Sequence, residues 1–442
     1  MRKLILRRLH SLCLLCGALL FCVVLLLPFT FCLSPSAAAG VVSTETREGR
    51  LAVFDDVWET IRDRYYDPSF HGIDWQAQRE TFRPLAAEAT SAAELYAVLR
   101  RMIGALRDAH TRVRTPDEKF DWRHPRAIGV GLSVREVEGA AVVVAVERAS
   151  EAERLGFRAG DTILSIDDEA ALSVFRRRLR EQGGSSTAGA ARLRAMATLF
   201  DGQRDTLVRI VWRSSDEKEK SGSLRREWRE RSTRVRVRDV GEGQVLVEFD
   251  VFAPDTALEF TRTTIAKLRD ARGIILDLRN NGGGDAEAMI EIASSFLPTG
   301  KSLGRFTDRT GRASFEAQTR SALLLSADAI TRLQAPVVVL AGERTSSAAE
   351  IFAHALKEAR RARIIGQPTC GCVLAIRRRH SLPDGGELDV SEMDYRTSTG
   401  ARLEGVGVVP DETVMLRKTD LLARRDRALE RALAYLSSES PR

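Results

Sequence analysis

Cysteine is scarce in most of this 442-residue chain, because four of its six cysteines lie within the first 39 residues. The remaining two, Cys370 and Cys372, are too few for the disulfide framework of a small secreted domain. A bridge between them would close a very small, strained ring. They supply only half of a zinc site, and no Cys or His cluster completes it. The favoured interpretation is a tight turn of two small residues, with no metal and no cofactor.

Aromatic residues are also few, at 6%, so the chain does not show an aromatic surface for stacking nucleic-acid bases. The formal net charge is +7, but four of the basic residues lie in the first 39 residues, which contain no acid. The small excess that remains is a weak argument for an anionic partner, and we expect no nucleic-acid binding. With 44% hydrophobic and 29% charged residues, the composition excludes disordered, collagen-like and polytopic membrane proteins.

Residues 1–39 have the three parts of a secretory signal. A basic stretch precedes an apolar run over residues 12–31, and Ala37 and Ala39 then stand at the two positions that a signal peptidase reads. We expect cleavage after Ala39 and export to the periplasm or the extracellular space. The apolar run is also long enough to span a bilayer. A retained anchor is therefore the alternative, and this uncleaved segment would be the only contact with a membrane.

The rest of the chain changes character along its length and predicts a multidomain α+β protein. Residues 44–122 place apolar side chains at helical spacing and predict an N-terminal helical domain. Residues 123–215 contain short β-like runs, and the charged residues 215–232 are interpreted as a linker. Residues 228–416 repeat a strand–loop–helix unit, which favours parallel strands and right-handed crossovers. Residues 417–442 are expected to form a C-terminal helix.

Two loops of the α/β region carry residues suited to chemistry. Residues 280–284 (NNGGG) follow a strand, and their glycines let backbone N–H groups approach a ligand. An anion hole is the favoured interpretation, with phosphate binding and a plain turn as alternatives. Ser347 stands directly before a predicted helix, where it is either a helix cap or a nucleophile aided by the helix dipole. Because both loops follow strands of one predicted sheet, they are expected to face each other.

A serine nucleophile needs a base, and spacing alone does not identify one. His354 lies seven residues after Ser347 on the same predicted helix, about 10 Å away and too far for a hydrogen bond. The other histidines outside the predicted signal are His71, His110, His124 and His380.

Several motifs together resemble the tail-specific, or C-terminal processing, serine peptidases, whose core is shared with the tricorn protease. The core motif D-L-R-x-N-x-G-G corresponds to residues 277–284, and S-A-S-A-S-E-I corresponds to residues 345–351 with Ser347 in the reactive position. The motifs G-x-x-T-x-G and E-G-x-G-V-x-P-D correspond to residues 366–371 and 404–411. The resemblance implies a PDZ-like domain at residues 123–215 and a ClpP/crotonase-like α/β peptidase core.

One departure from the family pattern concerns the base. The processing-protease branch places a lysine 25 residues after the serine, and here that position is Cys372, to which we assign no catalytic role. The tricorn-like branch instead uses a histidine in a D-x-H-[ST] stretch, which is similar to Asp108-Ala109-His110-Thr111. The resemblance therefore implies Ser347 as nucleophile, His110 as general base and Glu404 as the group that orients His110.

The same resemblance implies how substrate is held. The backbone amides of Gly283 and Ala348 are expected to form the oxyanion hole, and the PDZ-like loop Gly129-Val130-Gly131-Leu132 to bind a substrate C-terminus. The expected function is an exported serine endopeptidase that cleaves polypeptides near their C-termini. The alternative is a catalytically inactive protein on the same fold that binds peptides or lipophilic ligands.

Overall fold

The computed structural model describes residues 42–118, 126–230, 233–321, 333–439. The predicted signal at residues 1–39 lies outside these ranges. Within them, no helix combines the length and the apolar character needed to cross a membrane.

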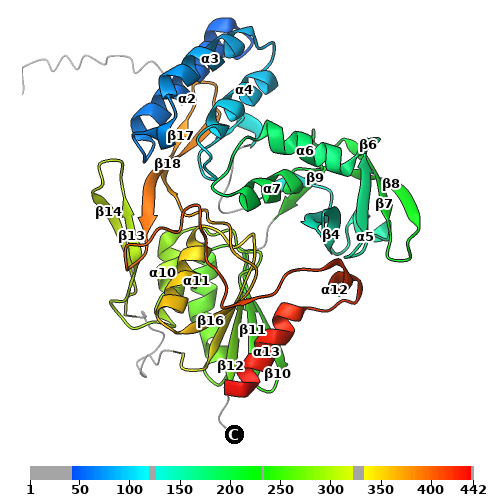
Figure 1. The fold of residues 1–442 in the computed structure, drawn as a ribbon, viewed down its shortest axis with the longest axis vertical. Helices are drawn as coiled ribbons and strands as arrows, with labels where there is room; N and C mark the ends of the chain where they lie inside the picture. The colour runs from blue at the N-terminus through cyan, green and yellow to red at the C-terminus, as the bar shows by residue number, and fades with distance from the viewer. Residues whose placement is uncertain (1–41, 119–125, 231–232, 322–332, 440–442) are drawn as a thin grey trace, which may run out of the picture. The chain divides into compact units, whose positions relative to one another are not determined.

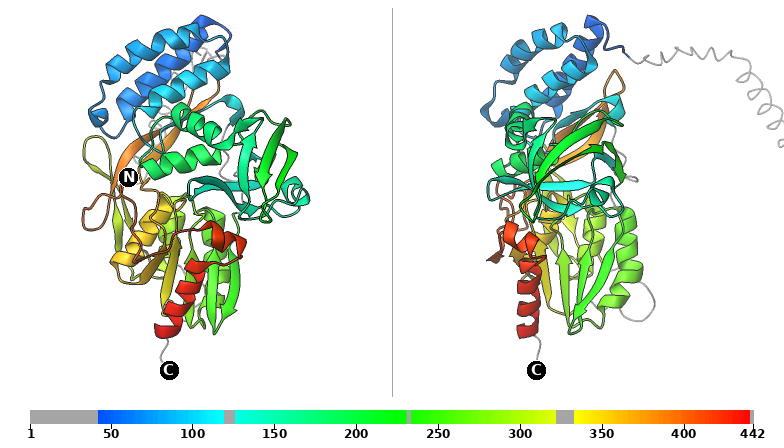
Figure 2. Two further views of the ribbon diagram at one scale, coloured as in Figure 1. Left: turned by 45° about the vertical axis from the view of Figure 1, so that its right-hand side comes forward. Right: turned by 90° about the vertical axis from the view of Figure 1, so that its right-hand side faces the viewer.

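Three helices form the N-terminal region, as the apolar spacing predicted (Figures 1 and 2). They are α2 (Arg47–Arg64), α3 (Trp75–Glu88) and α4 (Ala92–Gly104). The side chains of Thr46, Asp74 and Ser91 accept hydrogen bonds from first-turn amides, which begins each helix at its observed residue. The helices bury their apolar faces together with Leu388 and Val390 of a distant strand, so this region is not an independent core.

The middle region is a sheet with strand order β3-β4-β5-β7-β8, and β6 pairs with β5. Its strands are β3 (Leu132–Val137), β4 (Ala140–Val146), β5 (Thr162–Ile166), β6 (Glu169–Ala170), β7 (Leu207–Arg213) and β8 (Glu219–Arg225). Its helices are α5 (Glu151–Arg154), α6 (Ala171–Glu181) and α7 (Ala188–Ala197).

The interpretation of residues 215–232 as a linker was wrong. They contain β8 and β9 (Glu227–Glu230), which pair with β7 and with β2 (Arg126–Gly129) respectively. β8 lies at the edge of its sheet and is mostly exposed, so its charged side chains stay in water and conceal the strand pattern.

The α/β region is built on a six-stranded sheet in the order β10-β11-β12-β15-β16-β19. The strands are β10 (Arg236–Gly241), β11 (Gln244–Glu248), β12 (Gly273–Asp277), β15 (Val337–Ala341), β16 (Ala362–Gly366) and β19 (Glu412–Thr413). All pair in parallel except β10, and every residue of β12 and β15 is buried. Burial on both faces is typical of a parallel sheet covered by helices.

Helices cover both faces of this sheet, and the predicted strand–loop–helix units are present. α10 (Ala286–Ser294) follows β12, and α11 (Ala348–Glu358) follows β15, and both pack on one face. α13 (Arg427–Glu439), red in Figure 1, packs on the other face, after the short α12 (Lys418–Leu422). α8 (Pro254–Glu259), η3 (Phe260–Thr264) and α9 (Ile265–Leu268) connect β11 to β12. Because β12 and β15 are neighbours, the loops at residues 280–284 and 344–347 leave the same edge.

A second, antiparallel sheet was not predicted. It has the order β1-β18-β13-β14, and β17 pairs with β18. Its strands are β1 (Arg112–Arg114), β13 (Ser302–Thr307), β14 (Ala313–Gln318), β17 (Ala375–Ser381) and β18 (Glu387–Arg396). Through β1 this sheet holds the segment that follows α4, and therefore the loop that carries His110, beside residues from the C-terminal half of the chain.

Candidate active site

Ser347 stands at a sharp turn between β15 and α11, with φ 56° and ψ −126°. Few residues other than glycine adopt a positive φ. Backbone strain of this kind costs about 1–3 kcal/mol, and strained residues cluster at functional sites. A strand–turn–helix with this strain is the arrangement that presents a nucleophilic serine in other hydrolase folds. The Glu350 N–H donates to the Ser347 carbonyl oxygen, and the Glu350 carboxylate accepts the Ser347 N–H. Ser347 and Glu350 thus fix the start of the helix together.

The glycine loop lies directly against this turn. A Cβ atom on Gly283 would lie 2.6 Å from the Ser347 Cβ and 3.0 Å from the Ala348 nitrogen, and Gly283 has φ +88°. Only glycine fits there. Ala348 is the first residue of α11, so its N–H has no acceptor four residues back within the helix. The structure thus brings both residues of the expected oxyanion hole next to Ser347.

The Gly283 amide is nevertheless engaged in this state, which the sequence did not predict. It donates to the Asn281 Oδ1 at 2.9 Å, and the Asn281 Nδ2 in turn donates to the Phe249 carbonyl oxygen at 2.9 Å. Asn281 is fully buried, so it holds the loop from the inside. A substrate oxygen would have to compete with Asn281 for this N–H.

His110 lies on the loop after α4, and Asp108 shapes that loop. The Asp108 carboxylate accepts the His110 N–H at 2.6 Å and also binds the N–H and hydroxyl of Thr111. The His110 Nδ1 is buried and has no hydrogen-bond partner among the described residues. Burial lowers the pKa of the imidazole to about 4, partly opposed by the nearby Asp108 charge. His110 is therefore neutral at pH 7, which is the form that can accept a proton.

His110 and Ser347 are not hydrogen bonded to each other among the described residues, but Ser347 and Ala109, the residue before His110, both contact Cys372. Ala109 packs with Cys372 and Ala190 in one small apolar cluster, and the Ser347 N–H donates to the Cys372 carbonyl oxygen at 2.9 Å. Catalytic hydrogen bonds are often long without substrate and shorten when it binds.

Glu404 is not hydrogen bonded to His110 among the described residues, in contrast to the expected orienting bond. Its Oε2 instead accepts the N–H groups of Val373 and Leu374, at 2.7 and 3.2 Å. Ser186 lies between the two parts, because its Oγ accepts the Ala109 N–H at 3.1 Å and its hydroxyl is near enough to Glu404 to lower the pKa of that carboxyl. Burial raises the pKa of Glu404 to about 7, against these hydrogen bonds. Ser186 thus lies between the His110 loop and Glu404, and it gave no signal in the sequence.

Comparison with known proteins identifies the family. Residues 246–414 match peptidase family S41, and residues 47–104 match the tricorn protease C1 domain. The chain contains an S41 peptidase domain. It is a serine-type peptidase, as the motifs indicated, and it is similar to carboxyl-terminal-processing proteases.

Curated relatives and solved structures agree with this assignment. The peptidase is 28% identical over 402 residues to the chloroplastic C-terminal processing peptidase of Tetradesmus obliquus, covering 85% of this chain and 79% of that protein. It is 26% identical over 370 residues to the carboxyl-terminal-processing protease of a Synechocystis species, covering 81% and 79%. The photosystem II D1 C-terminal processing protease superposes with a TM-score of 0.56 at 25% identity, over 88% of this chain and 98% of that one. Mature CPAF complexed with lactacystin shares the fold, with a TM-score of 0.66 at 14% identity, over 89% and 97%.

The turn at the lysine position of the Ser–Lys branch contains a disulfide between Cys370 and Cys372, so the interpretation as an unbridged turn was wrong. The sequence shows only that the ring would be small. In the structure, the surrounding backbone contacts hold both cysteines in place. The Glu350 carboxylate accepts the N–H groups of Gly371 and Cys372, at 2.7 and 2.9 Å, and also the Thr369 hydroxyl. Glu350 is completely buried, and this burial raises its pKa to about 7.

The expected C-terminus-binding loop of the peptidase connects β2 to β3. Gly129 ends β2, Leu132 begins β3, and between them Gly131 has φ +78° with Ser150 directly behind it. β3 is an edge strand of its sheet and packs against α7. Glu136 on β3 forms an ion pair with Arg192 on α7.

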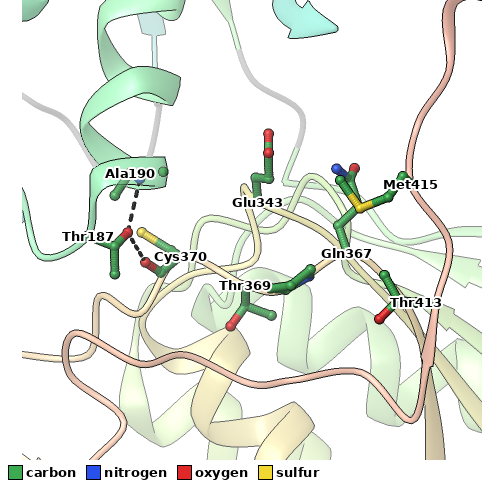
Figure 3. A pocket seen from close by; sticks show the side chains of 10 residues that line it. Thr187, Ala190, Glu343, Gln367, Thr369, Cys370, Thr413 and Met415 are labelled. Carbon is green, nitrogen blue, oxygen red and sulfur yellow. Dashed lines mark hydrogen bonds between the residues drawn. The ribbon is translucent and has the colours of Figure 1, made fainter. Parts of the chain in front are cut away.

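A cavity of about 260 Å³ lies beside the disulfide (Figure 3). One wall is the start of α7, and the other walls come from the loops after β15 and β16 and from the end of β19 with the segment after it. Its lining residues are Thr187, Gly189, Ala190, Glu343, Gln367, Pro368, Thr369, Cys370, Thr413 and Met415. Within the described part of the chain, no cluster of three or more potential metal ligands occurs.

Proposed function

We propose that this peptidase is an exported endopeptidase that cleaves polypeptides near their C-termini, with Ser347 as nucleophile and His110 as general base. The observation that carries the proposal is the strained Ser347 turn with the Ala348 amide beside it. The named activity of the curated relatives supports C-terminal processing.

Three positions are candidates for the general base of Ser347: residue 372, Lys357 and His110. Position 372 is a disulfide-bonded cysteine and supplies no amine. Lys357 lies ten residues after Ser347 on α11, and its Nζ binds the Val409 carbonyl oxygen at 2.7 Å and Asp411 at 2.9 Å. Its amine is therefore engaged by Val409 and Asp411. His110 is neutral, and its loop reaches the same Cys372 that binds the Ser347 backbone.

The reaction then follows the logic of a catalytic triad. His110 takes the proton of the Ser347 hydroxyl as the oxygen attacks the substrate carbonyl, and later passes it to the leaving amine. The Ala348 N–H stabilises the oxyanion at the helix N-terminus. The Gly283 N–H completes the hole once the oxyanion displaces Asn281. Glu404, acting through Ser186, holds in place the loop that carries the charged His110 imidazole.

For substrate selection we propose that the region around β3 acts as a PDZ-like domain. A peptide that pairs with the exposed edge of β3 would run beside α7, with its carboxylate at the amides of Gly129-Val130-Gly131-Leu132. A peptide with a free apolar C-terminus should therefore have a higher kcat/KM than its C-terminally amidated twin. Equal cleavage of the two would remove this part of the proposal.

A second candidate is an inactive binding protein on this fold, and the absent Ser347–His110 hydrogen bond favours it. Labelling with a serine-reactive fluorophosphonate separates the two functions. Covalent labelling that is lost in Ser347→Ala and slowed in His110→Ala supports the peptidase. A wild-type chain that binds C-terminal peptides but takes no label supports the binding protein. Sequencing of the mature N-terminus tests export, with Gly40 as the expected first residue.

A further inference from the structure

The turn Cys370-Gly371-Cys372 is hydrogen bonded to the turn that carries Ser347 and to the segment that follows Glu404. The Cys370 N–H donates to the Thr345 carbonyl oxygen at 3.0 Å, and the Cys372 carbonyl oxygen accepts the Ser347 N–H. The Gly371 carbonyl oxygen accepts the Gly405 N–H at 2.9 Å, directly after Glu404. Any change in this turn therefore reaches the nucleophile and the segment of Glu404 together.

We propose that the Cys370–Cys372 disulfide is a reversible modification site, at which exchange with a dithiol reductant switches the Ser347 turn from an ordered to a loosened state. The proposal rests on the proposed function in that Ser347 is taken as the nucleophile. A dithiol, as a small molecule or a protein, is the chemical class of the reactant.

The cavity gives the reductant access to one sulfur only. Cys370 is partly exposed and lines the 260 Å³ cavity, where Figure 3 shows its sulfur near Thr187. Cys372 is 1% exposed and packs against Ala109 and Ala190. A reductant thiolate would attack the Cys370 Sγ, the S–S bond would break, and Cys372 would leave as a thiolate that takes up a proton. The second thiol of the reductant then releases Cys370, so that two thiols form here and the dithiol becomes a disulfide.

The reduced turn cannot keep its present geometry, because two free thiols cannot lie as close as two bonded sulfurs. Cys372 is enclosed, so the displacement falls on Cys370 and on Gly371. Gly371 has φ +70°, and a Cβ atom there would lie 3.1 Å from the Gly407 nitrogen, so little free space surrounds it. Movement there weakens the hydrogen bonds to Glu350, which holds the Ser347 N–H.

The expected effect is on chemistry more than on binding, because the turn supports the nucleophile. Displacement of a reacting group by about 1 Å can lower a rate by about 100-fold. We expect reduction to lower kcat and the rate of fluorophosphonate labelling at least about tenfold, with a smaller change in KM.

The test compares the full chain with a Cys370→Ser/Cys372→Ser variant, each before and after treatment with dithiothreitol. Alkylation followed by mass spectrometry establishes the state of the two cysteines. The wild type should lose activity on reduction and regain it on reoxidation, while the variant keeps one low rate throughout. The variant keeps the four cysteines near the N-terminus, so any effect of reducing those would also occur in the variant. Equal wild-type rates with the thiols proven free, or an equal loss in the variant, would overturn the proposal.

Hydrogen–deuterium exchange separates this proposal from the proposed function. If no state of the chain labels or cleaves, the proposed function fails, and the amides of Ser347, Gly371 and Cys372 still report on the turn. Faster exchange in the reduced chain supports the modification site. Identical exchange in both states removes it, whatever the activity of the protein.

Discussion

The N–H of Ser347 donates a hydrogen bond to the carbonyl oxygen of Cys372 at 2.9 Å. The residue at the lysine position of the Ser–Lys branch is thus attached to the nucleophile through its main chain. Its side chain is bonded to Cys370 and packs beside Ala109, next to His110. A position that supplies the base in one branch serves here to hold the serine turn, and we propose that the base comes from another loop.

Replacement of His110 tests that base. His110→Ala should lower kcat by two to four orders of magnitude, about the loss expected for a general base within a triad. His354→Ala is the matched control, because His354 lies on α11 and forms a 4.0 Å contact with Glu358 instead. It should retain most activity. Steady-state kinetics, with folding checked by circular dichroism, decide the matter, and turnover by His110→Ala at the level of the control would refute the assignment.

The pH dependence should reflect the low pKa of His110. Burial lowers this pKa to about 4, so the base stays neutral well below pH 7. We expect kcat/KM to rise through roughly pH 4–5, lower than the range of an unperturbed imidazole near 6.5. An acid limb at about pH 8 or above would instead indicate an amine base.

The lowered pKa of His110 also affects the stability of the folded chain. Between about pH 6.5 and about 4 the unfolded chain binds a proton at His110 that the folded chain does not, so this residue lowers stability as the pH falls through that window. Urea unfolding of wild type and His110→Gln at pH 7 and pH 5 measures the effect. The variant should lose less stability between the two pH values than the wild type.

Two adjacent glycines offer a matched pair of variants. Gly283→Ala places a Cβ atom 2.6 Å from the Ser347 Cβ at a backbone with φ +88°, whereas a Cβ atom on Gly282 meets nothing within 4 Å. Gly283→Ala should abolish fluorophosphonate labelling, and Gly282→Ala should label at nearly the wild-type rate. Similar labelling rates for both variants would show that close approach of this loop to Ser347 is not required.

Glu350 should contribute to the stability of the fold. Its two oxygens accept three backbone N–H groups and the Thr369 hydroxyl, and Glu350→Gln would turn one oxygen into a donor that faces donors. We expect a loss of about 1–3 kcal/mol in unfolding free energy, the range for buried groups left unsatisfied. Glu358→Gln, on the same helix, is the control. Urea unfolding at pH 8 provides the measurement, and an unchanged midpoint for Glu350→Gln would contradict the prediction.

The sequence by itself determined the elements whose signals are local. Apolar periodicity identified the N-terminal helices, and the runs before residues 280 and 344 identified buried parallel strands, because burial on both faces demands continuous apolar residues. Parallel neighbours end at one edge, so the meeting of Gly283 with Ser347 also followed from the pattern. β8 was missed because an edge strand in water keeps charged side chains.

Only the tertiary structure decided how the site is connected. The Ser186 bridge to Ala109 joins residues 77 positions apart, and the Glu404 bond to Val373 joins residues 31 apart. Such hydrogen bonds depend on which loops the packed sheets bring together, and no local spacing encodes them. The capture of the Gly283 N–H by Asn281 and the bridge between Cys370 and Cys372 depend on backbone geometry within the folded core. The sequence named candidate residues for the site, and long-range packing set which of them touch.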